Sequence, residues 1–72
     1  MAVSYKKLWH LLIDRNMKKK DLEASAGINH YTMNKMRREE NVTTVVLGKI
    51  CTVLDCKVED IVEFLPDEET NS

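Results

Sequence analysis

The segment from Asn29 to Arg38 gathers polar and cationic side chains whose spacing suits hydrogen bonding along one side of a helix. Met33 and Met36 are three residues apart, which predicts the inward side of a helix over about residues 30–38. The opposite side would then present His30, Tyr31, Asn34, Lys35 and Arg38. An Asn amide can form two hydrogen bonds with adenine, and Lys or Arg can bond guanine. Contact with base edges is therefore the chemistry that this segment could perform.

Charge is distributed unevenly along the chain, although the formal net charge is only −1. Residues 15–38 hold seven Lys and Arg against two acidic residues, whereas residues 39–72 hold nine acidic residues against two lysines. A basic middle beside an acidic C-terminal third indicates a polar partner at one face. The lysines at 18–20 could be only a solvated helix start. Positive charge at a helix N-terminus is slightly unfavourable, however, which favours a functional role for them.

The periodicity of apolar residues predicts a first helix over about residues 4–15, capped by Ser4 and ending near Asn16. Its inward side would hold Tyr5, Leu8, Trp9, Leu12 and Ile13. Trp9 has the largest side chain of this set, and we expect it in the core with Leu12, Ile50 and Ile61.

A second helix is predicted over about residues 18–26, since Leu22 and Ala26 are four residues apart and Gly27 follows at once. Glycine readily adopts the positive φ that often ends a helix. Asn29 is a suitable N-cap for the helix that follows. Residues 18–38 therefore read as two short helices joined by a tight turn.

Two further helices are predicted in the acidic third of the chain. Thr43 or Thr44 would cap a fourth helix that ends at Asp55. A fifth would span about residues 58–65 and stop before Pro66. The apolar residues left over from these helices are candidates for a homodimer surface: Val45, Val62, Phe64 and Leu65.

Length and composition narrow the possible classes of protein. The 72 residues allow one domain, which we place at residues 1–66, followed by an acidic disordered tail over residues 67–72. No apolar run is long enough to span a membrane and no signal peptide is evident, so we expect a cytoplasmic protein. Cys51 and Cys56 are expected to be free, buried thiols.

The sequence offers no set of residues for catalysis or metal binding. The two cysteines are too far apart for a tight zinc pair, and His10 and His30 lie on different predicted helices. There is no nucleophile with a partner base, and no glycine-rich phosphate loop. We therefore expect no enzyme activity, no cofactor and no small-molecule ligand.

Residues 19–38 resemble the helix-turn-helix of the Cro/lambda-repressor-type regulators, also called the XRE family. The residues that carry the resemblance are Leu22, Gly27, Ile28, Met33 and Met36. It extends over about residues 3–65, through YKKLWHLLID and the apolar fourth helix. It implies an all-α fold: a compact five-helix lambda-repressor-like domain with the helix-turn-helix in its second and third helices.

The resemblance also implies double-stranded DNA as the partner, with the third helix in the major groove. The residues implied to contact bases are His30, Tyr31, Asn34 and Lys35. Those implied to contact the DNA backbone are Lys19, Lys20, Asn29 and Arg38. The function it favours is a sequence-specific transcriptional regulator that reads two half-sites as a homodimer.

Several features leave other readings open. Glu23 stands where the family usually has a small Ala, so its side chain must swing outward or the helix crossing must be looser. Tyr31 could cover the core as a lid, and Arg37 is expected to face Glu40 or solvent. The acidic C-terminal third also suits a protein-interaction or antitoxin-like module on the same fold. RNA binding has little support, since only Tyr31 could stack on bases.

Overall fold

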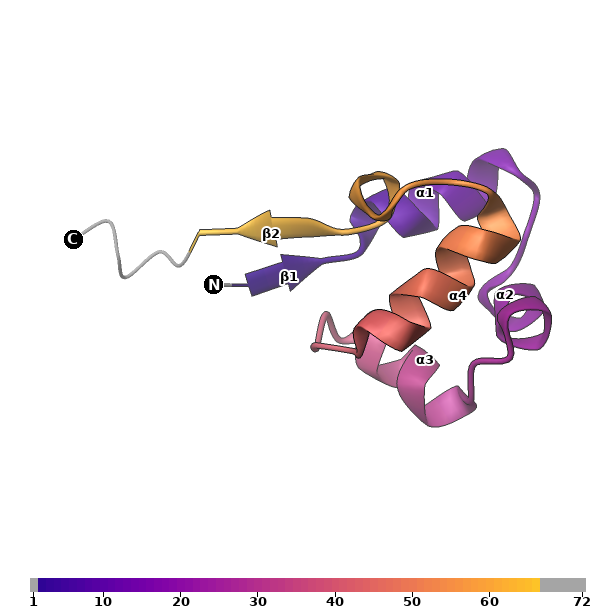
Figure 1. The fold of residues 1–72 in the computed structure, drawn as a ribbon, viewed down its shortest axis with the longest axis horizontal. Helices are drawn as coiled ribbons and strands as arrows, with labels where there is room; N and C mark the ends of the chain where they lie inside the picture. The colour runs from indigo at the N-terminus through magenta and orange to yellow at the C-terminus, as the bar shows by residue number, and fades with distance from the viewer. Residues whose placement is uncertain (1, 67–72) are drawn as a thin grey trace.

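Four α-helices, one 3₁₀ turn and two short β-strands follow one another along residues 2–66, the part of the chain that the computed structural model describes. The order is β1 (Ala2–Ser4), α1 (Lys6–Asp14), α2 (Lys19–Ala26), α3 (His30–Arg37), α4 (Thr44–Leu54), η1 (Val58–Asp60) and β2 (Glu63–Leu65). The helices form one body, and the two strands project from it side by side (Figure 1). The predicted tail over residues 67–72 lies outside the described residues.

Helix α1 begins later than predicted because Ser4 belongs to β1. The prediction of Ser4 as the N-cap is wrong: Tyr5 holds that position, and the Ser4 hydroxyl accepts a hydrogen bond from the Lys6 backbone N–H at 3.4 Å. The predicted end is confirmed, since Asn16 has a φ of 56° and Asn tolerates this conformation better than most residues. Ile13 is 69% exposed, so the inward side of α1 is narrower than predicted.

The core lies between the four helices and is closed by the segment after α4. The largest fully buried side chains are Tyr5, Leu8, Leu22, Met33, Met36, Ile50, Leu54 and Ile61. Tyr5 is the aromatic residue of this core, and the prediction that Trp9 lies in it is wrong. Trp9 is half-buried at the edge of the core, where its ring centre lies 4.7 Å from Lys19 Nζ. This cation–π contact needs one face of the indole to be open to the surface.

Local hydrogen bonds hold both ends of α2. The Lys18 backbone N–H donates to the Asp21 carboxylate at 2.9 Å, and the helix begins one residue later than predicted. Gly27 ends it with a φ of 67°, which confirms the predicted glycine turn. The Ile28 N–H then donates to the Glu23 carbonyl at 3.0 Å, which closes the turn.

Helix α4 packs against α2 and has the predicted boundaries. The Thr43 hydroxyl accepts a hydrogen bond from the Val46 N–H at 3.3 Å, and Asp55 ends the helix with a φ of 51°. Immediately afterwards, the Cys56 N–H donates to the Cys51 carbonyl at 3.1 Å. Both cysteines are free but half-buried, so the prediction of full burial is wrong. Burial and the neighbouring Cys51 raise the pKa of the Cys56 thiol, which makes it a weak nucleophile.

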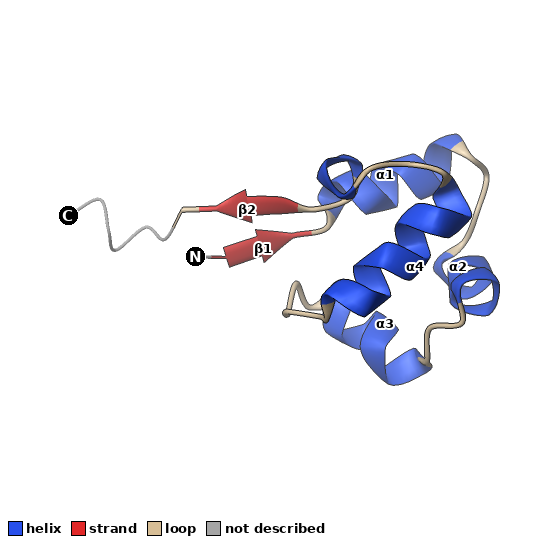
Figure 2. Ribbon diagram, in the orientation of Figure 1, coloured by secondary structure: helices blue, strands red, loops and turns tan. Residues whose placement is uncertain are grey.

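The prediction of a fifth helix over residues 58–65 is wrong, and the described residues 2–66 hold four α-helices. Only Val58–Asp60 turns, as a 3₁₀ helix, and Glu63–Leu65 forms β2, which pairs antiparallel with β1 (Figure 2). Val3 lies opposite Phe64 in this pairing. A helix of two turns makes few internal hydrogen bonds, whereas β1 supplies backbone partners for the same residues. The all-α class still describes the helical body, from which the two strands project (Figure 2), although Val3 of β1 belongs to the core.

One of the apolar residues predicted for a dimer surface is not available for contact. Val62 is 6% exposed and belongs to the core, because the chain turns inward there between η1 and β2. Val45, Phe64 and Leu65 are 64%, 66% and 39% exposed. These three remain the accessible part of that predicted surface.

Candidate nucleic-acid interface

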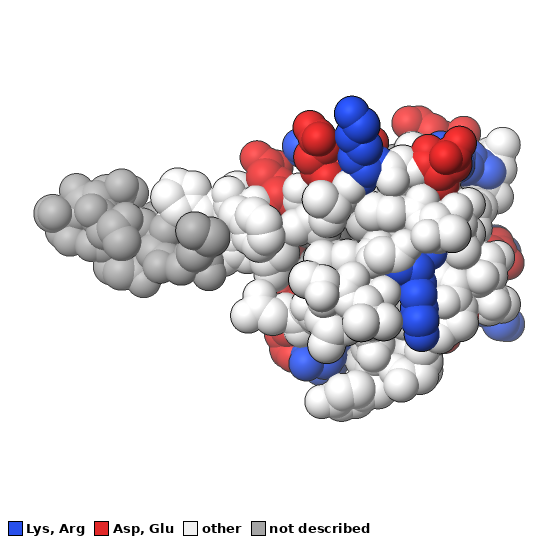
Figure 3. Space-filling view, in the orientation of Figure 1, with Lys and Arg blue, Asp and Glu red and all other residues white. Residues whose placement is uncertain are grey.

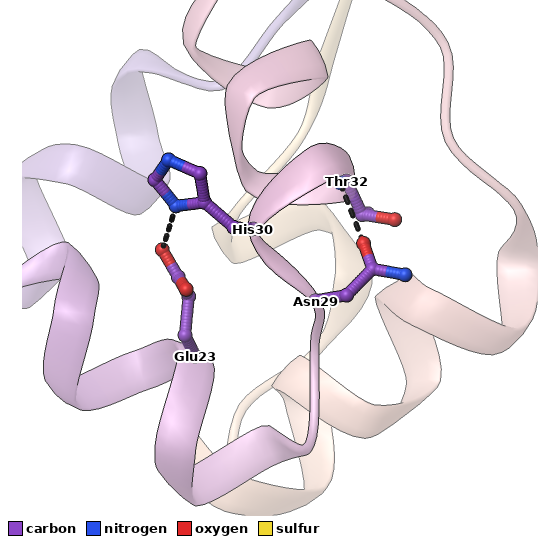
Figure 4. Close-up of polar contacts among 4 residues, drawn as sticks. All are labelled: Glu23, Asn29, His30 and Thr32. Atoms are coloured by element: carbon purple, nitrogen blue, oxygen red, sulfur yellow. Dashed lines mark hydrogen bonds and ion pairs between the residues drawn. The ribbon is translucent and has the colours of Figure 1, made fainter.

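Helix α3 is fixed by its first turn and by its buried side. The Asn29 Oδ1 accepts a hydrogen bond from the Thr32 backbone N–H at 2.8 Å, which confirms Asn29 as the N-cap (Figure 4). Met33 and Met36 are fully buried, as predicted. The cap and the two methionines together set the rotation of the helix, so its other side faces solvent.

The four residues predicted to contact bases lie in this helix, and all retain exposed surface. The His30 side chain is 70% exposed and Tyr31 is 69% exposed, while Asn34 and Lys35 are half-buried. The alternative that Tyr31 forms a lid over the core is therefore wrong. Lys35 Nζ lies 5.7 Å from the centre of the Tyr31 ring, within the range of a cation–π contact.

The residues predicted to contact the DNA backbone come from two neighbouring elements. Lys19 and Lys20 form the start of α2, whereas Asn29 and Arg38 flank α3. Lys20 and Arg38 are exposed, and Lys19 is half-buried beside Trp9. Helices α2 and α3 contact each other, so the four residues come from two adjacent elements.

Arg38 forms an exposed ion pair at the end of α3. Its Nε lies 2.7 Å from the Glu40 carboxylate, and Arg37 faces solvent instead of pairing with Glu40. The hydrogen bond and charge of the partner raise the pKa of Arg38 and lower the pKa of Glu40. Both groups therefore remain charged over the neutral pH range.

An open groove with a volume of about 490 Å³ lies between α3 and the start of α4. Tyr31 and Lys35 line it from α3, and Asn41 and Thr43 line it from the segment before α4. Thr43 was predicted only as a possible N-cap, and no role was predicted for Asn41. Both are polar residues shortly before a helix N-terminus, where backbone N–H groups favour phosphate, and this is the signal that could have indicated them.

A contact that the sequence did not predict joins α2 to the first residue of α3. The Glu23 carboxylate lies 3.4 Å from His30 Nδ1 (Figure 4). The Glu23 side chain is 19% exposed, and its carboxylate lies beside the ring rather than extending into solvent. The two helices remain in contact although Glu23 occupies a position where Ala is usual.

Acidic side chains lie at two places in the described part of the chain. Glu23 and Glu40 pair with His30 and Arg38 at the two ends of α3. Other acidic side chains lie along the edge formed by α1 and η1, which include the exposed residues Glu59 and Asp60 (Figure 3). The face of α4 between that edge and α3 is largely uncharged (Figure 3). The free cations of α3 are in its last turn, which carries Lys35 and Arg37.

Other kinds of site were sought in the same part of the chain. Among residues 2–66, no group of three or more His, Cys, Asp or Glu side chains is placed to hold a metal ion. No helix described there has the length and apolar character needed to cross a membrane.

Comparisons with known proteins agree with this geometry. The family model for the Cro/C1-type HTH DNA-binding domain matches residues 7–67. The crystal structure of the transcriptional regulator VanUg, Form II, is similar, with a TM-score of 0.88 and 48% sequence identity over 92% of this chain and 88% of that chain. Among curated protein sequences, no significant match is found. Because the family match includes both α2 and α3 and most of the remaining chain, the protein belongs to the family of Cro/C1-type helix-turn-helix DNA-binding domains.

Proposed function

We propose that the chain is a sequence-specific double-stranded DNA-binding transcriptional regulator whose helix α3 enters the major groove. The observation that carries this proposal is the outward side of α3, where a capped and methionine-anchored helix presents His30, Tyr31, Asn34 and Lys35. The major groove admits one helix, and the N-terminal residues of that helix contact the base edges. The likeness to VanUg, described as a transcriptional regulator, supports the regulatory role.

The surrounding cations and polar groups would hold the phosphates on either side of that groove. In this proposal Lys19, Lys20, Asn29 and Arg38 contact the DNA backbone. Asn29 uses its Oδ1 in the cap, so its amide N–H groups remain free to donate to a phosphate. The ion pair of Arg38 with Glu40 is exposed, and such pairs contribute only ~0–1 kcal/mol. A phosphate can therefore replace the Glu40 carboxylate.

We also propose that the regulator acts in the cytoplasm as a homodimer. A single domain of this size makes few base contacts, and two copies would read half-sites about 34 Å apart. Val45, Phe64 and Leu65 are the exposed apolar residues that would meet in such a dimer. No catalytic step and no cofactor are required for this function.

A protein-interaction module, including an antitoxin-like one, is the second candidate. The observation that favours it is the exposure of Phe64 and Val45, at 66% and 64%. Large exposed apolar side chains at neighbouring sites often mark a surface for a protein partner. This candidate predicts weak DNA binding without a preferred sequence.

The test is selection of the purified protein against a random library of duplex DNA at near-physiological salt, followed by sequencing. An enriched motif supports specific readout, and a palindromic motif supports the homodimer. Circular dichroism on the same preparation establishes that the protein is folded. A folded protein that enriches no motif would contradict the proposal and favour the interaction module.

A further inference from the structure

The contact between Glu23 and His30 has a consequence for how α3 reads DNA. His30 is the first residue of α3, and its side chain is 70% exposed. Glu23 lies on α2, and its side chain is only 19% exposed, so it is largely covered by its surroundings. The ring is thus exposed to a ligand while one of its nitrogens, Nδ1, is 3.4 Å from a largely buried acceptor.

The chemistry of the two groups determines which ring nitrogen carries the proton. A carboxylate can only accept a hydrogen bond, so Nδ1 must be the donor in this contact. In a neutral imidazole the other nitrogen, Nε2, is then an acceptor. Figure 4 shows that this second nitrogen lies on the side of the ring away from Glu23.

We propose that Glu23 is a positioning residue that fixes the direction and the tautomer of His30, so that His30 reads an exocyclic amine in the major groove. This inference rests on the proposed function. The amines offered there are N4 of cytosine and N6 of adenine, whereas guanine and thymine present only acceptors at the equivalent edge. Without Glu23 the ring can rotate, and its Nε2–H tautomer can donate to guanine or thymine instead.

A role in fold stability alone explains the Glu23–His30 pair less well than a role in base selectivity. An exposed ion pair contributes little to stability, and a carboxylate close to the DNA-binding helix reduces attraction to phosphates. Exclusion of water on DNA binding would strengthen the Glu23–His30 hydrogen bond at the moment when the ring direction matters. The position of the pair at the start of α3 therefore fits a role in selectivity better than one in folding.

The experiment measures base preference at each position of the selected motif for the wild-type chain, Glu23→Ala, His30→Ala and the double variant. It is run at pH 8. Glu39→Gln is the matched control, because it removes an exposed acidic charge just beyond the other end of α3. Thermal melting of each variant shows whether the fold is retained.

The expected result is a change at one base pair. The wild-type chain should prefer cytosine or adenine there by about tenfold, since a good base contact gives that much discrimination. Glu23→Ala should reduce this preference to less than about threefold while the melting temperature changes little. In the His30→Ala background, Glu23→Ala should have no further effect on that base pair, and Glu39→Gln should change only overall affinity.

Three results would overturn the inference, and they can be told apart. If the wild-type chain enriches no motif, both the proposed function and this inference fail. If Glu23→Ala keeps the full preference, the proposed function stands and the positioning role is wrong. If Glu23→Ala alters preference equally with and without His30, Glu23 acts by another route and the assignment to His30 is wrong.

Discussion

The ends of helices α2 and α3 are set by contacts between residues close in sequence, whereas β1 and β2 depend on pairing between the two ends of the described chain. The Asn29 cap bonds Thr32, three residues away, and Gly27 ends α2 by its own backbone conformation. In contrast, Ala2 pairs with Leu65. We therefore expect the helix-turn-helix to persist when the terminal sheet is weakened, and the predictions below test that division.

The largest expected effect comes from truncating the core beneath the motif. Leu22→Ala should lower the free energy of unfolding by about 2–5 kcal/mol, because Leu22 is fully buried and its loss leaves a cavity. Leu65→Ala in β2 removes the same atoms from a residue that is 39% exposed, and we expect a loss of about 1 kcal/mol or less. Urea unfolding followed by circular dichroism measures both. Equal losses would contradict the division between the two regions.

Substitutions at predicted base contacts and at predicted phosphate contacts should affect DNA binding in different ways. Asn34→Ala should change which sequences bind, with a loss of about 1–3 kcal/mol in discrimination at one base pair. Lys19→Ala should weaken binding to all sequences and reduce its salt dependence, since a phosphate contact carries no sequence information. Fluorescence anisotropy with the selected site and point-mismatched sites at several salt concentrations separates these effects.

The terminal sheet supplies the control for that measurement. Glu63→Gln removes one exposed charge from β2 and should leave both discrimination and affinity nearly unchanged. If Asn34→Ala and Lys19→Ala produced the same uniform loss, the assignment of base and backbone contacts would be wrong.

Two glycines allow a matched test of local backbone preference. Gly27→Ala should destabilise the fold by about 1–2 kcal/mol, because its φ of 67° is strained for a residue with a side chain even though no atom lies within 4 Å of the added Cβ. Gly48→Ala, inside α4, meets no atom within 4 Å and should stabilise the fold by about 0.5–1 kcal/mol. Thermal unfolding of both variants would show opposite shifts. Shifts of the same sign would contradict the role assigned to the turn.

The same distinction explains which features could be predicted from the sequence. Gly27, Asn29 and Asp55 act on their own backbone or on a residue a few positions away, so their types alone predict the helix ends. Residues 63–65 form a strand that pairs with β1, and no local sequence pattern indicates a pairing partner about 60 residues away. A segment with apolar residues at helical spacing can therefore form a β-strand when such a partner exists.

The candidate site shows the same limit at the level of side chains. The outward side of α3 followed from the spacing of Met33 and Met36. The contact between Glu23 and His30 did not, because it depends on how close α2 and α3 approach each other. Tyr5 and Trp9 were both predicted on the inward side of the first helix, and only Tyr5 is fully buried. The spacing could not separate them, because the hydroxyl of Tyr5 bonds the Glu40 carbonyl, 35 residues away.

Tyr5 connects the two regions, and removal of its hydroxyl should have a small effect on stability. Its hydroxyl donates to the Glu40 carbonyl at 2.7 Å, which joins the residue after β1 to the loop after α3. Tyr5→Phe should lower the free energy of unfolding by about 0.5–1.5 kcal/mol at neutral pH, since the ring remains and one hydrogen bond is lost. Urea unfolding measures the difference, and no loss would mean that the connection adds nothing to stability.

The stability lost in Tyr5→Phe should also depend on pH, and the burial of the Tyr5 phenol determines the direction of that dependence. Burial raises the pKa of the Tyr5 phenol above its ordinary value of 10.0. Below pH 10.0 the phenol is protonated in both the folded and the unfolded chain, and the hydroxyl makes its full contribution to the free energy of unfolding. Above that pH the unfolded chain loses the proton first. The contribution of the hydroxyl therefore falls as the pH rises through the raised pKa of the folded chain. The difference in stability between the wild-type chain and Tyr5→Phe should therefore shrink as the pH rises above 10. A constant difference across that range would place the hydroxyl in water rather than against the Glu40 carbonyl, and the two regions would then be joined only through the apolar core.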